Sequence, residues 1–153
     1  MTKTAEQYNR LKRWYNLFLE INQGITHNRD SDYYVDTVYS FFQNCHHLKD
    51  WVVNDEENVL TANDLNVYIN RNKELKVCGA LCNGSKHLVI KNENFDKNTR
   101  IDHKEIKLAL GGGTPHIKIK FEISTSDETY DAFDLATKCL SLWEDFLKIN
   151  KII

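Results

Sequence analysis

The chain has very little proline and glycine for its length. Of its 153 residues, one is proline (Pro115) and six are glycine, and half of the glycines form a single run at 111–113. Because these two residue types end helices and mark turns, their scarcity favours long helices. The sequence also lacks internal repeats, low-complexity tracts and proline-rich linkers. We therefore expect a single domain over residues 1–153.

Long apolar runs and an excess of one charge are missing as well. The longest run without a charged or strongly polar residue is Val77–Cys82, far short of the ~20 residues that a membrane helix needs. The first ten residues have no apolar stretch after a basic one, so we expect no secretory signal, a cytosolic location and no membrane association. A net charge of −2 excludes a globally basic nucleic-acid binder.

Charge is nevertheless distributed in blocks. Residues 65–120 carry eleven basic and five acidic side chains, a net charge of +6. Such a region could attract the phosphates of a nucleic acid. The alternative is a solvated sheet face whose lysines discourage edge-to-edge pairing.

Cysteine occurs four times, at Cys45, Cys78, Cys82 and Cys139. Each lies in a segment with a helical pattern, so we expect free thiols that pack as small hydrophobic side chains. A metal site is the alternative, because Cys78 and Cys82 lie one helical turn apart and could bind zinc with Cys45 or His46. The turn-borne cysteine pairs typical of structural zinc sites are missing, so we expect no metal and no cofactor.

Apolar residues at helical spacing predict three helices in the first half of the chain. The first begins with a capping box at Thr4–Gln7 and ends at Gly24. The second begins at Asp30-Ser31-Asp32, whose side chains can cap it, and ends near His47–Asp50. A short apolar anchor at 51–53 follows. The third helix is expected from about Asn63 to Cys82, with Asn83-Gly84 as its stop.

The apolar period then changes to two, which predicts strands. They are expected at 88–90, 106–110 and 117–123, with Gly111–Pro115 as a hairpin between the last two. A final helix should start at Ser126–Glu128, and its two apolar faces indicate a central position. The fold class is α+β: mainly a helical bundle of about four helices, with a small antiparallel sheet before the last helix.

Histidines are the candidate acid–base groups. His46, His87 and His103 could act near neutral pH. Their spacing along the sequence does not indicate a Ser-His-Asp or Cys-His catalytic arrangement.

Two polar stretches resemble the signatures of a family of uncharacterised bacterial and phage proteins. In residues 41–51 (FFQNCHHLKDW), an aromatic-rich helix ends in a His-Leu-Lys-Asp-Trp run, and residues 81–87 (LCNGSKH) end in Asn-x-x-Lys-His. The family is distantly similar to HEPN helical bundles, some of which are ribonucleases with an Arg-x₄₋₆-His motif. This chain departs from that motif, since Arg71 lies 16 residues before His87 and Arg100 lies three before His103. The site residues that the resemblance implies are His46, Lys49, Asp50, Trp51, Asn83, Lys86 and His87.

Two interpretations of these residues stay open. If the 50–62 segment folds back, the two stretches converge, either as an active site or as a polar clasp in which Asp50 and Lys86 form an ion pair. We predict a protein that binds a macromolecular partner, either another protein or a second copy of this chain, with phage–host conflict as one setting. The alternative is a HEPN-like ribonuclease or related nucleic-acid enzyme that uses His87 and His46.

Overall fold

The structure is a computed structural model, and it describes residues 1–24, 30–86, 94–109 and 116–153. These ranges form five helices and a three-stranded sheet. In chain order the elements are α1 (Lys3–Gln23), α2 (Ser31–Asn54), α3 (Ala62–Arg71), α4 (Lys73–Lys86), β1 (Arg100–Ala109), β2 (His116–Ser124), β3 (Thr129–Asp131) and α5 (Ala132–Ile149). The predicted α+β class, mainly helical with a small sheet before the last helix, is confirmed.

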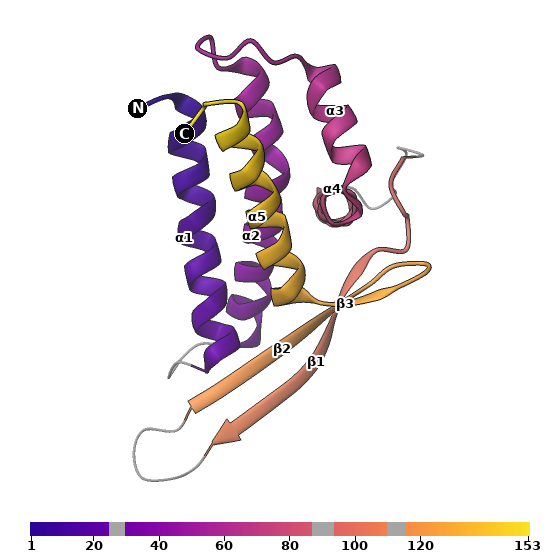
Figure 1. The fold of residues 1–153 in the computed structure, drawn as a ribbon. Helices are drawn as coiled ribbons and strands as arrows, with labels where there is room; N and C mark the ends of the chain where they lie inside the picture. The colour runs from indigo at the N-terminus through magenta and orange to yellow at the C-terminus, as the bar shows by residue number, and fades with distance from the viewer. Residues whose placement is uncertain (25–29, 87–93, 110–115) are drawn as a thin grey trace.

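The arrangement is a bundle of long helices with a sheet at one end. Helices α1, α2 and α5 run side by side, α4 runs across them, and the sheet lies across the lower end of the bundle (Figure 1). The sheet has the order β1-β2-β3 and is antiparallel throughout, with a bulge between His103 and Glu105. Within the described ranges, no helix combines the length and the apolar character that crossing a membrane requires.

Several helix ends lie where the sequence predicts them. Asp30 caps α2 by accepting a hydrogen bond from the Tyr33 N–H, and Gly24 ends α1 in the left-handed conformation, with φ of 83°. The predicted cap of the first helix is wrong, because Thr2 fills that position. Thr4 is buried instead and donates its hydroxyl to the Asp55 carboxylate at 2.8 Å, which ties the start of α1 to the end of α2.

Three other boundaries need correction. Helix α2 continues to Asn54, so the expected apolar anchor at 51–53 is its last turn. The single helix expected from Asn63 to Cys82 is two helices, separated at Asn72, whose backbone is extended. The final helix begins at Ala132, because residues 129–131 pair with β2 as a third strand. The expected strand at 88–90 and the hairpin turn at 111–115 lie outside the described residues.

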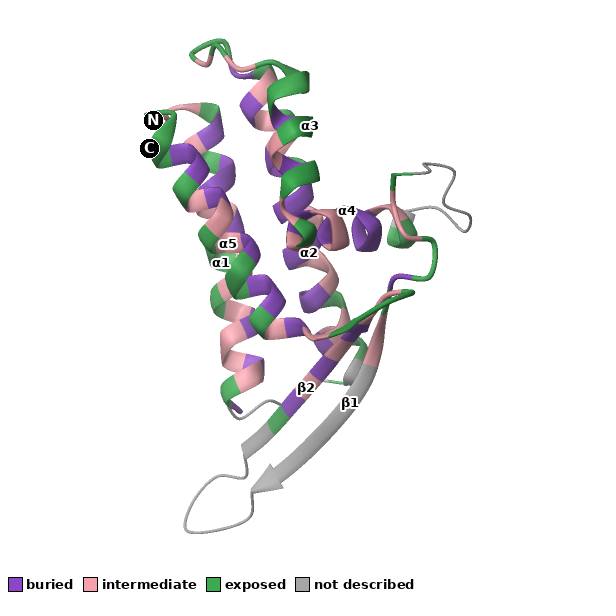
Figure 2. Ribbon diagram, turned by 45° about the vertical axis from the view of Figure 1, so that its right-hand side comes forward, coloured by how far each residue is buried: buried purple, intermediate pink, exposed green. Residues whose placement is uncertain are grey.

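The core lies where α4 and α5 meet α2. Its side chains come from every helix and from β2, and purple, buried segments face inward on each helix (Figure 2). Its largest fully buried members are Leu11, Phe18, Ile21, Phe41, Phe42, Leu48, Leu65, Leu81, Ile123, Trp143 and Leu147.

Candidate functional site

The crossing of α2 and α4 holds one part of the predicted signature. The His46 side chain is 8% exposed, and its ring meets the ring of Phe95 edge-on at 5.9 Å. It also touches the position of Gly79, where a Cβ atom would lie 3.0 Å from His46 Cε1. His46 is therefore enclosed between α4 and the segment that leads to β1.

This environment determines the protonation state of His46. Burial, followed by the positive charges of Lys49 and His47, lowers the pKa of His46 to about 3. The imidazole is neutral at pH 7 and is a weak base there, whereas a general base is most effective with a pKa near the working pH.

Other residues of the signatures also contact each other across this crossing. His47 Nε2 lies 3.6 Å from the Cys82 sulfur, and the Gln43 side-chain amide donates to Ser85 Oγ at 3.1 Å. Asn83 donates its side-chain amide to the carbonyl of Gly79, one turn earlier in its own helix, at 2.9 Å.

Lys49 and Asp50 lie on a different part of the surface. Both line a pocket of about 230 Å³ with Ala62 and Leu65 of α3, and Asp50 also lines a pocket of about 330 Å³ with Lys3 of α1. No hydrogen bond joins Asp50 and Asn83 among the described residues, and the Asn83 side chain donates to Gly79 instead.

Among the described residues, the two predicted stretches meet through Gln43 and His47 on one side and Ser85 and Cys82 on the other. Trp51 lines the pocket that Asp50 and Lys3 also line. The Arg10 guanidinium carbon lies over the Trp51 ring, 5.6 Å from the centre of that ring. The side chain of Lys86, all of His87 and the side chain of His103 lie outside the described residues. The Asp50–Lys86 clasp therefore stays a prediction.

Another pocket lies where α4 faces the sheet, and we call it the junction pocket. Its volume is about 340 Å³, at the lower end of the range for small-ligand sites. Its lining comes from α4, from the segment before β1, and from the β2–β3 turn and β3: Lys73, Lys76, Val77, Ala80, Asn94, Asp96, Thr99, Thr125, Asp127, Glu128 and Tyr130.

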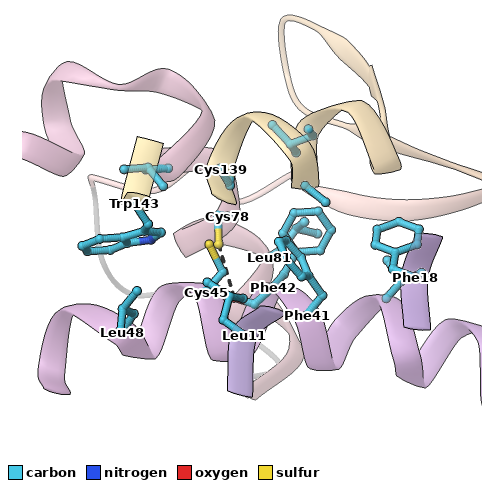
Figure 3. Close-up of a cluster of buried hydrophobic side chains, with 14 of the residues drawn as sticks. Leu11, Phe18, Phe41, Phe42, Cys45, Leu48, Cys78, Leu81, Cys139 and Trp143 are labelled. Carbon is cyan, nitrogen blue, oxygen red and sulfur yellow. Dashed lines mark hydrogen bonds between the residues drawn. The ribbon is translucent and has the colours of Figure 1, made fainter. Parts of the chain in front are cut away.

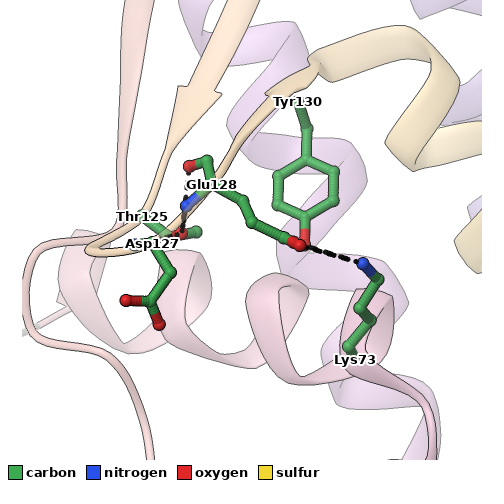
Figure 4. Close-up of polar contacts among 5 residues, drawn as sticks. All are labelled: Lys73, Thr125, Asp127, Glu128 and Tyr130. Atoms are coloured by element: carbon green, nitrogen blue, oxygen red, sulfur yellow. Dashed lines mark hydrogen bonds and ion pairs between the residues drawn. The ribbon is translucent and has the colours of Figure 1, made fainter.

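One wall of the junction pocket is a polar network (Figure 4). Lys73 Nζ lies 3.2 Å from both carboxylate oxygens of Glu128, and the Tyr130 hydroxyl donates to the same carboxylate. Thr125 fixes the turn, because its hydroxyl accepts a hydrogen bond from the Glu128 N–H at 2.9 Å. The bonds from Tyr130 and Lys73 lower the pKa of Glu128, while burial and then Glu128 raise the pKa of Tyr130 to about 12.

The remaining polar groups of the pocket differ in whether they have a hydrogen-bond or ion-pair partner. Asp96 accepts hydrogen bonds from the Ser126 hydroxyl at 2.7 Å and the Asn98 N–H at 2.8 Å. Lys76 is half-buried, and none of the ion pairs in the described ranges includes its ammonium group. The Thr99 hydroxyl is buried in the pocket wall without a hydrogen-bond partner in the described part of the chain.

A cluster of three thiols lies in the core, and we call it the thiol cluster. Cys45 of α2, Cys78 of α4 and Cys139 of α5 are fully or almost fully buried, and their sulfur atoms lie within 4.8 Å of one another (Figure 3). Cys78 donates to the Phe42 carbonyl at 3.2 Å, and Cys139 donates to the Glu74 carbonyl at 3.5 Å. The fourth cysteine, Cys82, is outside the cluster, beside His47.

The three thiols are not equivalent. Burial raises the pKa of Cys78 and of Cys139 well above the usual range. Burial also acts to raise the pKa of Cys45, but the S–H and N–H donors of Cys139, Cys78 and Trp143 near its sulfur favour a thiolate there, and they outweigh burial and lower that pKa to about 5. The three thiols therefore titrate as one coupled group that favours a single thiolate.

No family model, curated protein or solved structure matches this chain. Its function has to be inferred from the residues themselves.

The thiol cluster and the junction pocket were both missed at the level of sequence. Cys45, Cys78 and Cys139 each fall on a predicted buried face, which is a usable signal, but periodicity does not say which faces meet. The metal alternative grouped Cys78 with Cys82 and with Cys45 or His46, whereas the structure groups Cys78 with Cys45 and Cys139 and leaves Cys82 outside. The junction pocket depends on the break at Asn72, which the helical pattern does not reveal.

Proposed function

We propose that the protein acts by binding rather than by catalysis, and that the junction pocket receives an acidic side chain of a protein partner. The observation that carries this proposal is the state of Lys76. It is a half-buried cation with no carboxylate partner among the described residues, in a pocket where the carboxylates of Asp96 and Glu128 are engaged in internal contacts.

The remaining lining suits a glutamate or aspartate side chain. Val77 and Ala80 offer apolar surface to its methylene groups, and the Lys76 ammonium offers a charge-assisted hydrogen bond to its carboxylate. The pocket volume of about 340 Å³ leaves room for bridging water beside such a group.

The described residues offer less support for a nucleic acid in this region. Three cations of the basic 65–120 block form ion pairs: Arg100 with Asp102, Lys73 with Glu128, and Lys120 with Asp131. Of the two lysines that line the junction pocket, Lys73 is paired with Glu128, so Lys76 alone is left among the described residues to meet a phosphate, whereas a phosphodiester backbone is bound through several cations.

The ribonuclease alternative also stays a prediction. His46 is enclosed and is a weak base, and His87 lies outside the described residues. A cytoplasmic location and a setting in phage–host conflict likewise stay predictions, and both are compatible with a binding protein.

The proposal is tested with a matched pair of short peptides, acetyl-Gly-Glu-Gly-amide and acetyl-Gly-Gln-Gly-amide. Titrated into the labelled protein and followed by NMR, the glutamate peptide is expected to shift the amide signals of Val77, Ala80 and Thr125. We expect a dissociation constant on the order of a millimolar, as one anchored side chain allows.

Variants then assign the effect to the pocket. Lys76→Met should weaken binding by about fivefold or more, equivalent to roughly 1 kcal/mol for a partly exposed ion pair. Lys138→Met removes an exposed charge of α5 outside the pocket and should leave binding unchanged. Equal shifts with the glutamine peptide, or unchanged affinity in Lys76→Met, would contradict the proposal.

A further inference from the structure

The thiol cluster has a donor set that the proposed binding function does not use. Its three sulfur atoms come from three different helices, yet all lie within 4.8 Å of one another. Metal–sulfur bonds of about 2.3 Å place three sulfurs around one ion about 4 Å apart. The cluster therefore needs only small side-chain shifts to surround an ion.

The number and kind of ligands restrict which ion fits. Among the described residues, no histidine, aspartate, glutamate or fourth cysteine joins the three thiols. Structural zinc is almost always bound by four ligands, so a set of three sulfurs is incomplete for zinc. Monovalent copper is soft, prefers thiolates and is stable with three of them. We propose that Cys45, Cys78 and Cys139 form a three-coordinate site for one Cu(I) ion.

A second observation points to charge at this position. The indole N–H of Trp143 is buried without a hydrogen-bond partner in the described part of the chain, and Trp143 lies beside the cluster (Figure 3). A thiolate at Cys45 gives this N–H an acceptor. The orphaned donor is thereby satisfied, and the excess negative charge of a copper–thiolate centre is partly offset.

The binding step balances without an oxidant or a reductant. Copper enters as Cu(I) and stays Cu(I). Each thiol that becomes a ligand loses its proton to solvent, and its sulfur donates an electron pair to the ion. Cys78 and Cys139 give up only weak S–H hydrogen bonds to the Phe42 and Glu74 carbonyls.

Burial determines how the ion enters. Because the three cysteines are at most 1% exposed, the ion has to bind while the chain folds or when the helices separate. An ion held only by the folded chain stabilises it, so loading and stability are linked.

The test uses the full chain, refolded from urea without oxygen in the presence of Cu(I) buffered by a competing Cu(I) chelator. Copper per chain is measured after desalting, and X-ray absorption on the loaded protein reports the ligand atoms. We expect about one copper per chain, three sulfur ligands and a higher melting temperature than that of the metal-free protein.

The fourth cysteine provides the matched control. Cys82→Ala leaves the cluster intact and should retain copper like the wild type. Cys139→Ala removes a ligand, so it should lower the affinity for copper by at least about 10–100-fold, which is the loss seen when a residue that only supports a ligand is changed. Circular dichroism checks that each variant folds, and the X-ray absorption result stands without any variant. The assignment would be overturned if the folded wild type held no copper or if the copper ligands included nitrogen. It would also be overturned if Cys82→Ala lost its copper, or if the protein retained zinc as well as it retains copper.

Discussion

His46 shows how the burial of one side chain makes the stability of a protein depend on pH. His46 and His47 are adjacent on α2, but His46 is enclosed by α4 and Phe95 whereas His47 is exposed. The pKa of His46 is lowered to about 3, chiefly by burial, while a histidine in the unfolded chain titrates near 6.5. Between these two values the unfolded state binds a proton that the folded state does not, so stability falls as the pH drops through this window.

The resulting prediction concerns the free energy of unfolding between pH 7 and pH 5. His46 should account for a loss of about 2 kcal/mol over that interval. His46→Gln should remove this part of the pH dependence, and His47→Gln should keep it. Urea unfolding followed by tryptophan fluorescence at several pH values measures the slopes. Equal slopes for the two variants would show that His46 titrates as it does in the unfolded chain.

At this scale, sequence reasoning identified the residue but not its environment. His46 was selected as a candidate together with Lys49 and Asp50, four or fewer positions away. On a helix, residues three or four positions apart share a face but lie about one turn apart along the axis, so they can still meet different neighbours. The structure indeed turns His46 toward α4 and Asp50 toward pockets formed with α1 and α3.

Among the elements, the break between α3 and α4 has the largest consequences. At Asn72 the backbone N–H donates to the Ile69 carbonyl, and the side chain donates to the Tyr68 carbonyl at 2.8 Å, which completes the end of α3. Helix α4 then crosses α2 and directs Leu75, Cys78 and Leu81 into the core. The segment contains neither glycine nor proline at this point, so its local pattern favours one continuous helix, and tertiary packing overrides that preference.

Gly79 makes the close approach of α4 possible and offers a test of it. A Cβ atom there would lie 2.5 Å from Phe95 Cε1 and 3.0 Å from His46 Cε1. Alanine at a helix interior gains up to about 1 kcal/mol over glycine, but overpacking here costs about 1–3 kcal/mol. We therefore expect Gly79→Ala to destabilise the protein by about 1 kcal/mol in the wild-type background.

In the Phe95→Ala background, the same substitution should become less costly or stabilising, because the nearest obstacle is gone. A double-mutant cycle by chemical denaturation measures the coupling, which we expect to be about 1 kcal/mol or more. Additive effects would mean that Phe95 does not restrict α4 at this position.

On the scale of the whole molecule, the sequence predicted the class and the order of elements better than their contacts. The helical period of α1, α2 and α5 and the alternation in β2 are local properties, and each appears as expected. The third strand was missed because it has only three residues and is held by pairing with β2. Which helix faces meet is a non-local property, so the thiol cluster and the junction pocket could not be predicted.

Buried contacts are distributed unevenly among the helices, and this predicts that some helices unfold locally more easily than others. Helix α2 buries six core side chains completely (Val38, Phe41, Phe42, Cys45, Leu48 and Val52), whereas α3 buries only Leu65 and Ile69. Since regions with few buried apolar contacts open at lower free energy, amides of α3 should exchange with solvent at an opening free energy at least about 2 kcal/mol below that of α2.

Two variants separate local from global opening. The Tyr68 hydroxyl donates to the Leu142 carbonyl of α5 at 2.6 Å and so ties α3 to the bundle. This bond is broken both when α3 opens and when the whole chain unfolds, so Tyr68→Phe should lower the opening free energies of α3 and of α2 alike by about 1 kcal/mol. Ile21→Val shortens a buried core side chain of α1 and should lower the opening free energy of α2 by about 1 kcal/mol, while that of α3 stays the same. Native-state hydrogen exchange followed by NMR measures both. If Ile21→Val lowers the protection of α3 as much as that of α2, α3 opens only together with the rest of the chain.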